Sequence, residues 1–143
     1  MVEHQAVCNH LLWMQRAFPL TEADRVLLKY PFNFDASICE IFGPLLAGAR
    51  LIVPEPSDRW DVGQFVRTMT EEQVTVLDVV PSMLEALLDE SGFSSCLYLR
   101  RVTSGGEPLS PRLRDRFFAQ MDAELHNIYG PTEATIGTTS WTW

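Results

Sequence analysis

The chain has 143 residues, of which 46% are hydrophobic and 21% are charged, a composition typical of one globular domain with a single core. Its net charge of -8 argues against a nucleic-acid partner, because neutralising phosphates requires a basic surface. Lys29 is the only lysine in the sequence, which excludes a phosphate loop ending in Gly-Lys-Ser or Gly-Lys-Thr.

The three cysteines, Cys8, Cys39 and Cys96, are odd in number and contain no Cys-x-x-Cys pair. This usage favours a reducing, cytoplasmic location and argues against a cysteine-based metal site. No apolar run approaches the ~20 residues that a membrane span requires, and no signal-peptide pattern opens the chain. The sequence therefore predicts neither a membrane nor a nucleic acid as a partner.

Hydrophobic periodicity alternates between the helical and the strand pattern along the chain. In chain order it predicts a helix at 4–18, a strand at 25–32, a helix at 37–49, a strand at 50–55, a helix at 62–69, a strand at 74–81, a helix at 82–88, a strand at 97–103, a helix at 110–121 and a strand at 123–129. Residues 54–61 are the most loop-like stretch.

Capping patterns support three of these helices. Ser37 and Glu40, and again Ser82 and Glu85, have the spacing of a capping box at the starts of the second and fourth helices. Ser110, followed by a proline, is placed to cap the fifth helix.

Strands that alternate with helices of about ten residues predict parallel pairing through helical crossovers. We therefore expect residues 1–143 to form one α/β domain, a three-layer flavodoxin-like sandwich with a five-stranded parallel sheet. Ligands bind beyond the carboxyl ends of the strands in such sheets. Polar stretches fall at these ends, at 32–37, 103–108 and 129–133, and Asp78 lies near a fourth, so the sequence predicts a binding site at this edge.

Two carboxylates have alternative interpretations. Asp35 precedes a helix start, where it could stabilise free backbone amides, or it could anchor the ammonium group of a ligand; Ser37 as the cap favours the second role. Asp78 interrupts an apolar strand, where burial without a partner is costly. It either lies partly exposed to solvent at the strand end, hydrogen-bonded to nearby amides, or faces a polar or cationic group of a ligand.

Two short motifs suggest nucleotide chemistry. Residues 104–107, Ser-Gly-Gly-Glu, follow a strand and are either an ordinary turn or a place where a ligand approaches the backbone. Residues 129–133, Tyr-Gly-Pro-Thr-Glu, combine an aromatic face, a turn, a hydroxyl and a carboxylate. Thr132 suits a phosphate oxygen, and Glu133 suits a hard cation such as Mg²⁺. His4, His10 and His126 lack metal-ligand spacing and are interpreted as structural.

Residues 32–56, 102–110 and 127–141, taken together and in this order, resemble the adenylation domains of nonribosomal peptide synthetases. These domains belong to the adenylate-forming superfamily, with acyl-CoA synthetases and luciferases. The resemblance covers essentially all 143 residues. It implies an enzyme that activates an amino acid with ATP and Mg²⁺ and passes the aminoacyl group to the phosphopantetheine thiol of a carrier domain, alongside condensation domains.

The resemblance also implies roles for individual residues. Asp35 would pair with the α-ammonium group of the substrate, with Phe34 beside the route of its carboxylate. Thr132 would touch the α-phosphate and Glu133 would hold the metal, as the two catalytic positions. The nucleotide would be bound by Gly105, Gly106, Glu107, Asn127, Tyr129, Gly130 and Thr132.

The side-chain pocket implied by the resemblance has Asp35 at its mouth. Its lining would be Ala36, Cys39, Asp78, Val102, Ser104, Ile128, Ile136 and Gly137. A carboxylate that faces a ligand is best neutralised by a cation or a strong donor. We therefore expect a substrate side chain with an amine, a guanidinium or a hydroxyl group.

The sequence also departs from the family. The phosphate loop would precede residue 1, and the ribose-binding aspartate and the C-terminal domain with its catalytic lysine would follow Trp143. Lys29 falls in a strand and cannot be that lysine. We therefore expect a fragment, the substrate-recognition subdomain, that does not turn over alone and exposes apolar surface near its first helix and after Trp141. The alternatives are a fragment of an acyl- or aryl-acid ligase and a non-catalytic binding scaffold.

Overall fold

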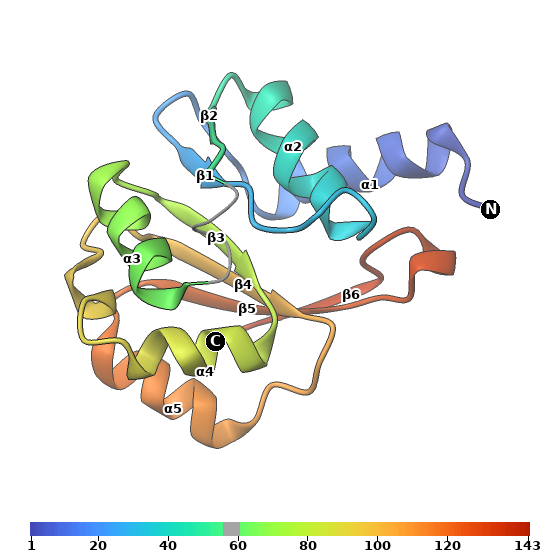
Figure 1. The fold of residues 1–143 in the computed structure, drawn as a ribbon. Helices are drawn as coiled ribbons and strands as arrows, with labels where there is room; N and C mark the ends of the chain where they lie inside the picture. The colour runs from blue at the N-terminus through green and yellow to red at the C-terminus, as the bar shows by residue number, and fades with distance from the viewer. Residues whose placement is uncertain (56–60) are drawn as a thin grey trace.

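A computed structural model describes residues 1–55 and 61–143 (Figure 1). Its helices and strands are α1 (His4–Ala17), β1 (Arg25–Leu27), α2 (Ala36–Ala47), β2 (Arg50–Ile52), α3 (Val62–Glu71), β3 (Val76–Val79), α4 (Pro81–Asp89), β4 (Arg101–Gly105), α5 (Pro111–Gln120), β5 (Glu124–Tyr129) and β6 (Thr139–Thr142). Short 3₁₀ helices lie at Phe93–Ser95 and Thr132–Ala134. The expected loop at 54–61 falls largely outside the described residues.

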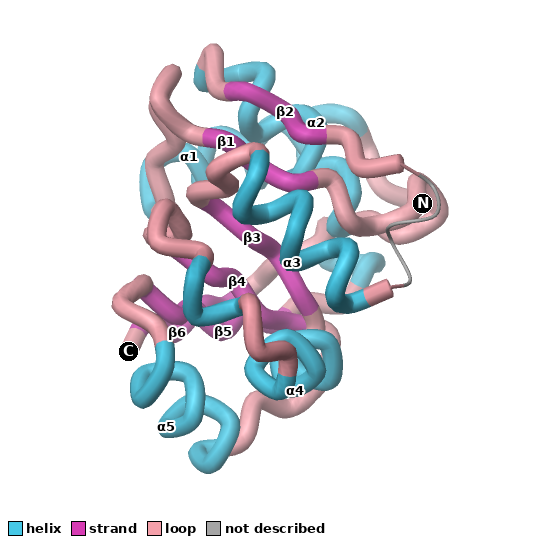
Figure 2. Tube along the Cα trace, turned by 60° about the vertical axis from the view of Figure 1, so that its left-hand side comes forward, coloured by secondary structure: helices cyan, strands magenta, loops and turns pink. Residues whose placement is uncertain are grey.

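The sheet has the strand order β2-β1-β3-β4-β5-β6. The first five strands pair in parallel, and β6 pairs antiparallel with β5. Helices α1 and α2 cover one face of the sheet, and α3, α4 and α5 cover the other (Figures 1 and 2). The predicted three-layer α/β fold is confirmed, with six strands in place of five.

The sixth strand was missed because its sequence has no apolar alternation. All four residues of β6 are exposed, and two of them are threonines. Its pairing with β5 instead depends on the intervening turn, which returns the chain so that Thr139 lies opposite Tyr129. The hydroxyl-rich block after residue 137 is therefore partly an edge strand.

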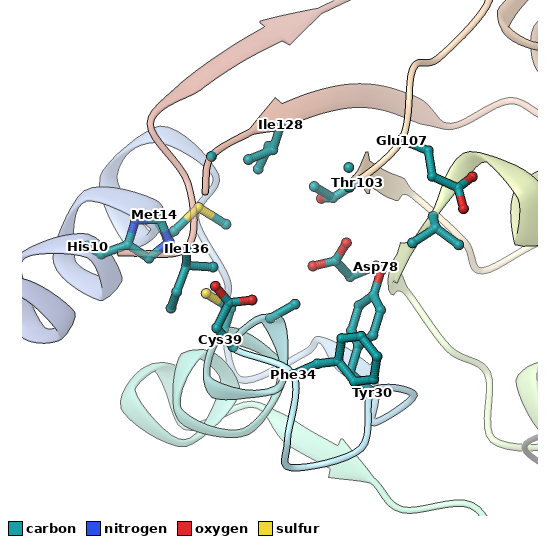
Figure 3. Close-up of a pocket in the computed structure, with 16 residues that line it drawn as sticks. His10, Met14, Tyr30, Phe34, Cys39, Asp78, Thr103, Glu107, Ile128 and Ile136 are labelled. Carbon is teal, nitrogen blue, oxygen red and sulfur yellow. The ribbon is translucent and has the colours of Figure 1, made fainter. Parts of the chain in front are cut away.

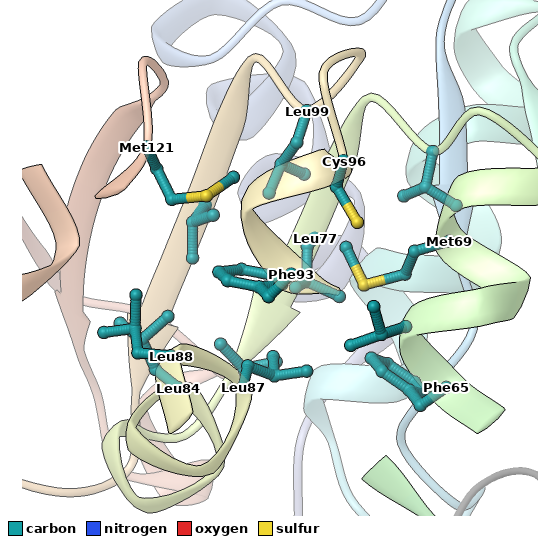
Figure 4. Close-up of a cluster of buried hydrophobic side chains, with 14 of the residues drawn as sticks. Phe65, Met69, Leu77, Leu84, Leu87, Leu88, Phe93, Cys96, Leu99 and Met121 are labelled. Atoms are coloured by element: carbon teal, nitrogen blue, oxygen red, sulfur yellow. The ribbon is translucent and has the colours of Figure 1, made fainter. Parts of the chain in front are cut away.

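The main hydrophobic core lies between the sheet and the layer of α3, α4 and α5 (Figure 4). Leu77, Val102 and Leu125 enter it from three adjacent strands and have no exposed surface. Because successive strand residues point to opposite faces, Asp78 and Thr103 face the other layer. This alternation decides which residues belong to the core and which reach the cavity described below.

Only one of the three predicted caps is formed. Ser110 accepts a hydrogen bond from the Leu113 amide at 3.2 Å, as predicted. Ser37 instead donates to the Phe34 carbonyl at 2.7 Å. Ser82 lies inside α4, which begins one residue earlier at Pro81. The predictions of capping boxes at 37–40 and 82–85 are therefore wrong.

Glu40 has a different role from the predicted one. Its Oε2 accepts hydrogen bonds from the amides of Lys29 at 3.0 Å and Tyr30 at 2.8 Å. The side chain is buried in α2, so these bonds fasten the end of β1 to that helix. This contact holds the segment that leads to Phe34 and Asp35.

Asp24 joins three segments that are far apart in the sequence. Its carboxylate accepts two hydrogen bonds from Arg100, at 2.7 and 2.9 Å, and one from the Thr75 hydroxyl at 2.8 Å. Burial alone would raise the pKa of Asp24, but the bonds from Arg100, the Thr21 amide and Thr75 outweigh it and hold this pKa well below its usual range.

We therefore expect Asp24→Asn to lower the free energy of unfolding at pH 7 by about 2 kcal/mol, because the buried end of the pair loses its charge. A lowered folded-state pKa stabilises the fold above the ordinary value of 3.8, and this contribution is lost as the pH falls below it. Urea unfolding at pH 7 and pH 3 measures the difference, which should shrink at pH 3. Exposed Asp115→Asn is the control, and equal effects of the two variants would contradict the assignment.

Exposed apolar side chains lie where they were expected and at further places. Leu12 on α1 is 55% exposed and Trp141 on β6 is 64% exposed. Also exposed are Phe42, Leu45 and Leu46 on α2 and, outside the helices and strands, Phe32, Val53, Leu97 and Tyr98. None of the described helices is long and apolar enough to span a bilayer.

Candidate functional site

A cavity of about 340 Å³ opens between the carboxyl ends of the central strands and the layer of α1 and α2 (Figure 3). It lies at the sheet edge where the sequence predicts ligand binding. Six of the nine residues predicted to bind substrate line it, namely Asp35, Ala36, Cys39, Asp78, Ile128 and Ile136. Four of those predicted to bind nucleotide also line it, namely Gly105, Gly106, Glu107 and Gly130.

Asp35 stands directly before α2 but does not cap it. Its side chain makes no hydrogen bond to the amides of the first helical turn, and its backbone is already helical. The carboxylate instead lines the cavity. Asp35 is therefore available to a ligand, as the second of its two interpretations requires.

Val102 and Ser104 are not brought to the cavity. Both are fully buried, and Val102 belongs to the core on the opposite face of the sheet. Their neighbours Thr103 and Gly105 line the cavity in their place. A shift of one residue along a strand reverses the face, which is why Thr103 and Gly105 reach the cavity while Val102 and Ser104 do not. The buried Ser104 hydroxyl has no partner, and nothing in the described residues explains it.

Gly137 lies just outside the cavity lining. A Cβ at this position would meet Cε1 of His10 and Cγ2 of Ile128, each at 3.0 Å. It borders a second hollow, between α1 and residues 134–138, to which Trp13 also contributes. Gly137 therefore packs closely against two residues that line the cavity, His10 and Ile128.

The remaining nucleotide and metal positions lie beside the cavity. Tyr129 ends β5 and is exposed, and Asn127 lies two residues earlier on that strand. Thr132 and Glu133 are exposed on a 3₁₀ helix that follows Gly130. No cluster of three or more His, Cys, Asp or Glu side chains that could hold a metal occurs in the described part of the chain. The roles of these four residues remain predictions.

Two glycines allow backbone segments to approach closely at the site. A Cβ on Gly105 would lie 2.6 Å from the Ile128 carbonyl oxygen. A Cβ on Gly130 would lie 2.4 Å from the Ile136 carbonyl oxygen and 2.6 Å from Cα of Gly137. Ile136 itself has a φ of 72°, which is rare for a β-branched residue. The turn that delivers Ile136 to the cavity is thus both tight and strained.

Sequence reasoning missed several lining residues. These are His10, Met14, Tyr30, Val80 and Thr103, while Phe34 was expected nearby. His10 and Met14 lie four residues apart on α1, so the helical spacing that predicted this helix also places both on one face. Burial lowers the pKa of His10, against the opposing effects of the Gly137 backbone and Asp35. His10 is a cavity residue, not merely a structural one.

Electrostatics in and behind the cavity are dominated by buried acids. Burial raises the pKa of the Asp78 carboxyl to about 7, against the attraction of Lys29 and Arg101. Burial, reinforced by repulsion from Asp78, raises the pKa of Glu40 to about 9, although two backbone amides oppose the shift. Burial likewise raises the pKa of the Cys39 thiol, so this side chain is neutral at the cavity wall.

The family model of the AMP-binding enzymes matches residues 1–143. The chain belongs to the AMP-binding enzyme family. The resemblance seen in the three sequence stretches is thereby confirmed. Among curated members of this family, tyrocidine synthase 3 of Brevibacillus parabrevis is 46% identical over 141 residues, 99% of this chain and 2% of that protein. Enterobactin synthase component F of Escherichia coli is 41% identical over 145 residues, 99% of this chain and 11% of that protein.

Solved structures of the AMP-binding family have the same fold. The nonribosomal peptide synthetase FmoA3 matches with a TM-score of 0.91 and 31% identity, over 99% of this chain and 16% of its own. The Vibrio cholerae adenylation domain AlmE, solved in complex with glycyl-adenosine-5'-phosphate, matches with a TM-score of 0.89 and 28% identity, over 99% of this chain and 27% of its own. The chain thus spans a small part of the proteins it resembles.

Proposed function

We propose that residues 1–143 are the amino-acid-recognition subdomain of an adenylation domain in a nonribosomal peptide synthetase. The complete enzyme activates an amino acid with ATP to an aminoacyl adenylate and loads it on the phosphopantetheine thiol of a carrier domain. The observation that carries this proposal is Asp35, a carboxylate that lines the cavity and makes no bond to its own helix. Family membership and the aminoacyl nucleotide bound by AlmE support the same reaction.

The substrate amino acid binds with its α-ammonium group against Asp35, because an ion pair in a partly dehydrated cavity is strong and directional. Ile128 and Ile136 then contact the substrate side chain from β5 and the following turn. The Gly105–Gly106 backbone lies along the same cavity and supports the adenine beside Asn127 and Tyr129.

Thr132 and Glu133 act on the phosphate side of the reaction. Mg²⁺ is held in proteins by one or two carboxylates together with substrate phosphates, so an exposed single carboxylate such as Glu133 fits this ion. Bound Mg²⁺ neutralises phosphate charge. Thr132, one residue earlier, donates its hydroxyl to the α-phosphate and orients it.

The chain covers only a small part of the length of its relatives, and the proposed partners are the remaining parts of such proteins. The rest of the adenylation domain, with the phosphate loop and the catalytic lysine, completes the site. Carrier and condensation domains of a longer synthetase receive the product. With those groups missing from residues 1–143, the chain alone is expected to be inactive.

An acyl- or aryl-acid ligase is the alternative within the same family. Asp35 discriminates, because a carboxylate at the cavity mouth repels substrates that have no α-amine. The test places residues 1–143 in a complete adenylation domain and measures ATP–pyrophosphate exchange with amino acids, fatty acids and aryl acids. We expect exchange with an amino acid only, and none from the isolated chain. Exchange driven by acids without an α-amine would contradict the proposal.

A further inference from the structure

Asp78 is a carboxylate of the cavity wall for which the described residues provide no hydrogen-bond or ion-pair partner. It projects from β3 into the cavity, between Thr103 on β4 and Tyr30 (Figure 3). In the described residues, burial raises its pKa, and the charges of Lys29 and Arg101 oppose that shift. An unpaired carboxylate in such surroundings is costly, so its position at a ligand cavity calls for a ligand group.

Of the other two cavity carboxylates, one has a partner in the protein and one is assigned to the substrate. Glu107 accepts hydrogen bonds from the Ser82 amide at 2.9 Å and from the Ser82 hydroxyl at 3.0 Å. Asp35 is assigned to the substrate α-ammonium group by the proposed function. Among the described residues that line the cavity there is no lysine and no arginine. Asp78 is thus the acidic lining residue that is left for the substrate side chain.

In the described residues, neither of the two cations behind Asp78 forms a hydrogen bond or an ion pair with it. The Lys29 ammonium group lies over the Tyr30 ring, 4.5 Å from its centroid. Arg101 is buried and directs Nη1 to the Pro19 carbonyl oxygen at 3.4 Å. The nearby acid Glu40 repels negative charge at Asp78 as well, while Tyr30 and Cys39 face it in neutral form.

We propose that the substrate of this enzyme is an amino acid with a cationic side chain, an amine or a guanidinium, whose charged end binds Asp78. This inference rests on the proposed function and names its substrate class. A hydroxyl could donate one hydrogen bond, but only a cation also neutralises the carboxylate. Thr103 lies opposite Asp78 in the β3–β4 pairing and offers the cation a further acceptor oxygen.

The pH dependence of substrate binding gives a direct readout. Because burial raises the pKa of Asp78 to about 7, the free site is mostly protonated at pH 6 and mostly ionised at pH 8. Side-chain amines stay charged over this range, so a cationic substrate binds more tightly as the pH rises. KM for the cationic substrate should fall about tenfold from pH 6 to pH 8, while KM for a neutral analogue changes little.

The experiment measures ATP–pyrophosphate exchange by a complete adenylation domain that contains residues 1–143. The amino acids are lysine, ornithine and arginine, with norleucine, glutamine and glutamate for comparison. We expect the highest kcat/KM with one of the three cationic amino acids. Asp78→Asn should lower that value about 100-fold and leave kcat/KM for norleucine and glutamine unchanged or raised. Exposed Asp115→Asn should change neither.

The outcomes separate this inference from the proposed function. If no amino acid supports exchange, the proposed function fails. If a neutral amino acid is preferred and Asp78→Asn leaves the ranking unchanged, the proposed function stands and the inference is wrong. The pH profile of the unaltered domain needs no variant, so a flat KM for lysine, ornithine and arginine would overturn the inference even where Asp78→Asn does not fold.

Discussion

Asp35→Ala is expected to reduce amino-acid-dependent pyrophosphate exchange about 1,000-fold in a complete adenylation domain that contains residues 1–143. The variant removes the charge that we propose to pair with the substrate α-ammonium group, and truncating one partner of a dehydrated ion pair costs about 4 kcal/mol. The loss should appear in kcat/KM for every amino acid tested, because all of them share this group. Steady-state exchange assays over a range of amino-acid concentrations measure it.

The same variant separates the two interpretations of Asp35. If the carboxylate served the helix, its removal would destabilise the fold by about 1 kcal/mol. Because Asp35 makes no side-chain bond to α2, we expect thermal unfolding of the 143-residue chain to be unchanged. Exposed Asp115→Asn, matched in charge, should leave both measurements unchanged. A lowered melting temperature with unaltered exchange would show that Asp35 is structural.

Gly130→Ala is expected to destabilise the chain by about 3 kcal/mol, in the range that marks a steric clash in the fold. The added Cβ would lie 2.4 Å from the Ile136 carbonyl oxygen and 2.8 Å from the Thr138 amide nitrogen, and both are backbone atoms that cannot rotate away. The turn between β5 and β6 must open to relieve this contact. Because that turn delivers Ile136 to the cavity, exchange should also fall about 100-fold.

Gly43→Ala is the matched control for Gly130→Ala. Its Cβ would meet only Cδ1 of Leu20, at the ordinary distance of 3.6 Å, within α2. Alanine has a higher helix propensity than glycine, so this change should be neutral or stabilise the fold by up to about 1 kcal/mol. Urea unfolding of both variants provides the comparison. A Gly130→Ala chain as stable as the Gly43→Ala chain would mean that the turn is not fixed as described.

Most of the fold could be predicted because hydrophobic periodicity reflects the layer that each element must cover. The positions of α1, α3 and α5 follow from apolar spacing, and the parallel sheet follows from the alternation of strand and helix. The β6 strand could not be predicted in this way, because an exposed edge strand buries no face. Its pairing depends on turn geometry, which short-range patterns do not contain.

Site residues could be predicted where a charged side chain stands out from its sequence context. Asp78 stood out because it interrupts an apolar strand and Asp35 because it precedes a helix start, and both line the cavity. The faces of Val102 and Thr103 could not be assigned from the sequence, because the face of each residue depends on strand register. The failure of Ser37 as a cap has a similar origin, since Asp35 takes the N-cap position of α2, two residues before the one that the motif implies.

Strands β3 and β4 each hold two kinds of residue that can be varied independently. Leu77 and Val102 belong to the packed interior, while Asp78 and Thr103 line the cavity on the other face of the sheet. Combinatorial libraries restricted to positions 78 and 103 should therefore retune which amino acid is accepted while the molecule keeps its folding cooperativity. Because the two faces of the sheet carry different residues, substrate selectivity could change at these positions without an equal loss of folding stability.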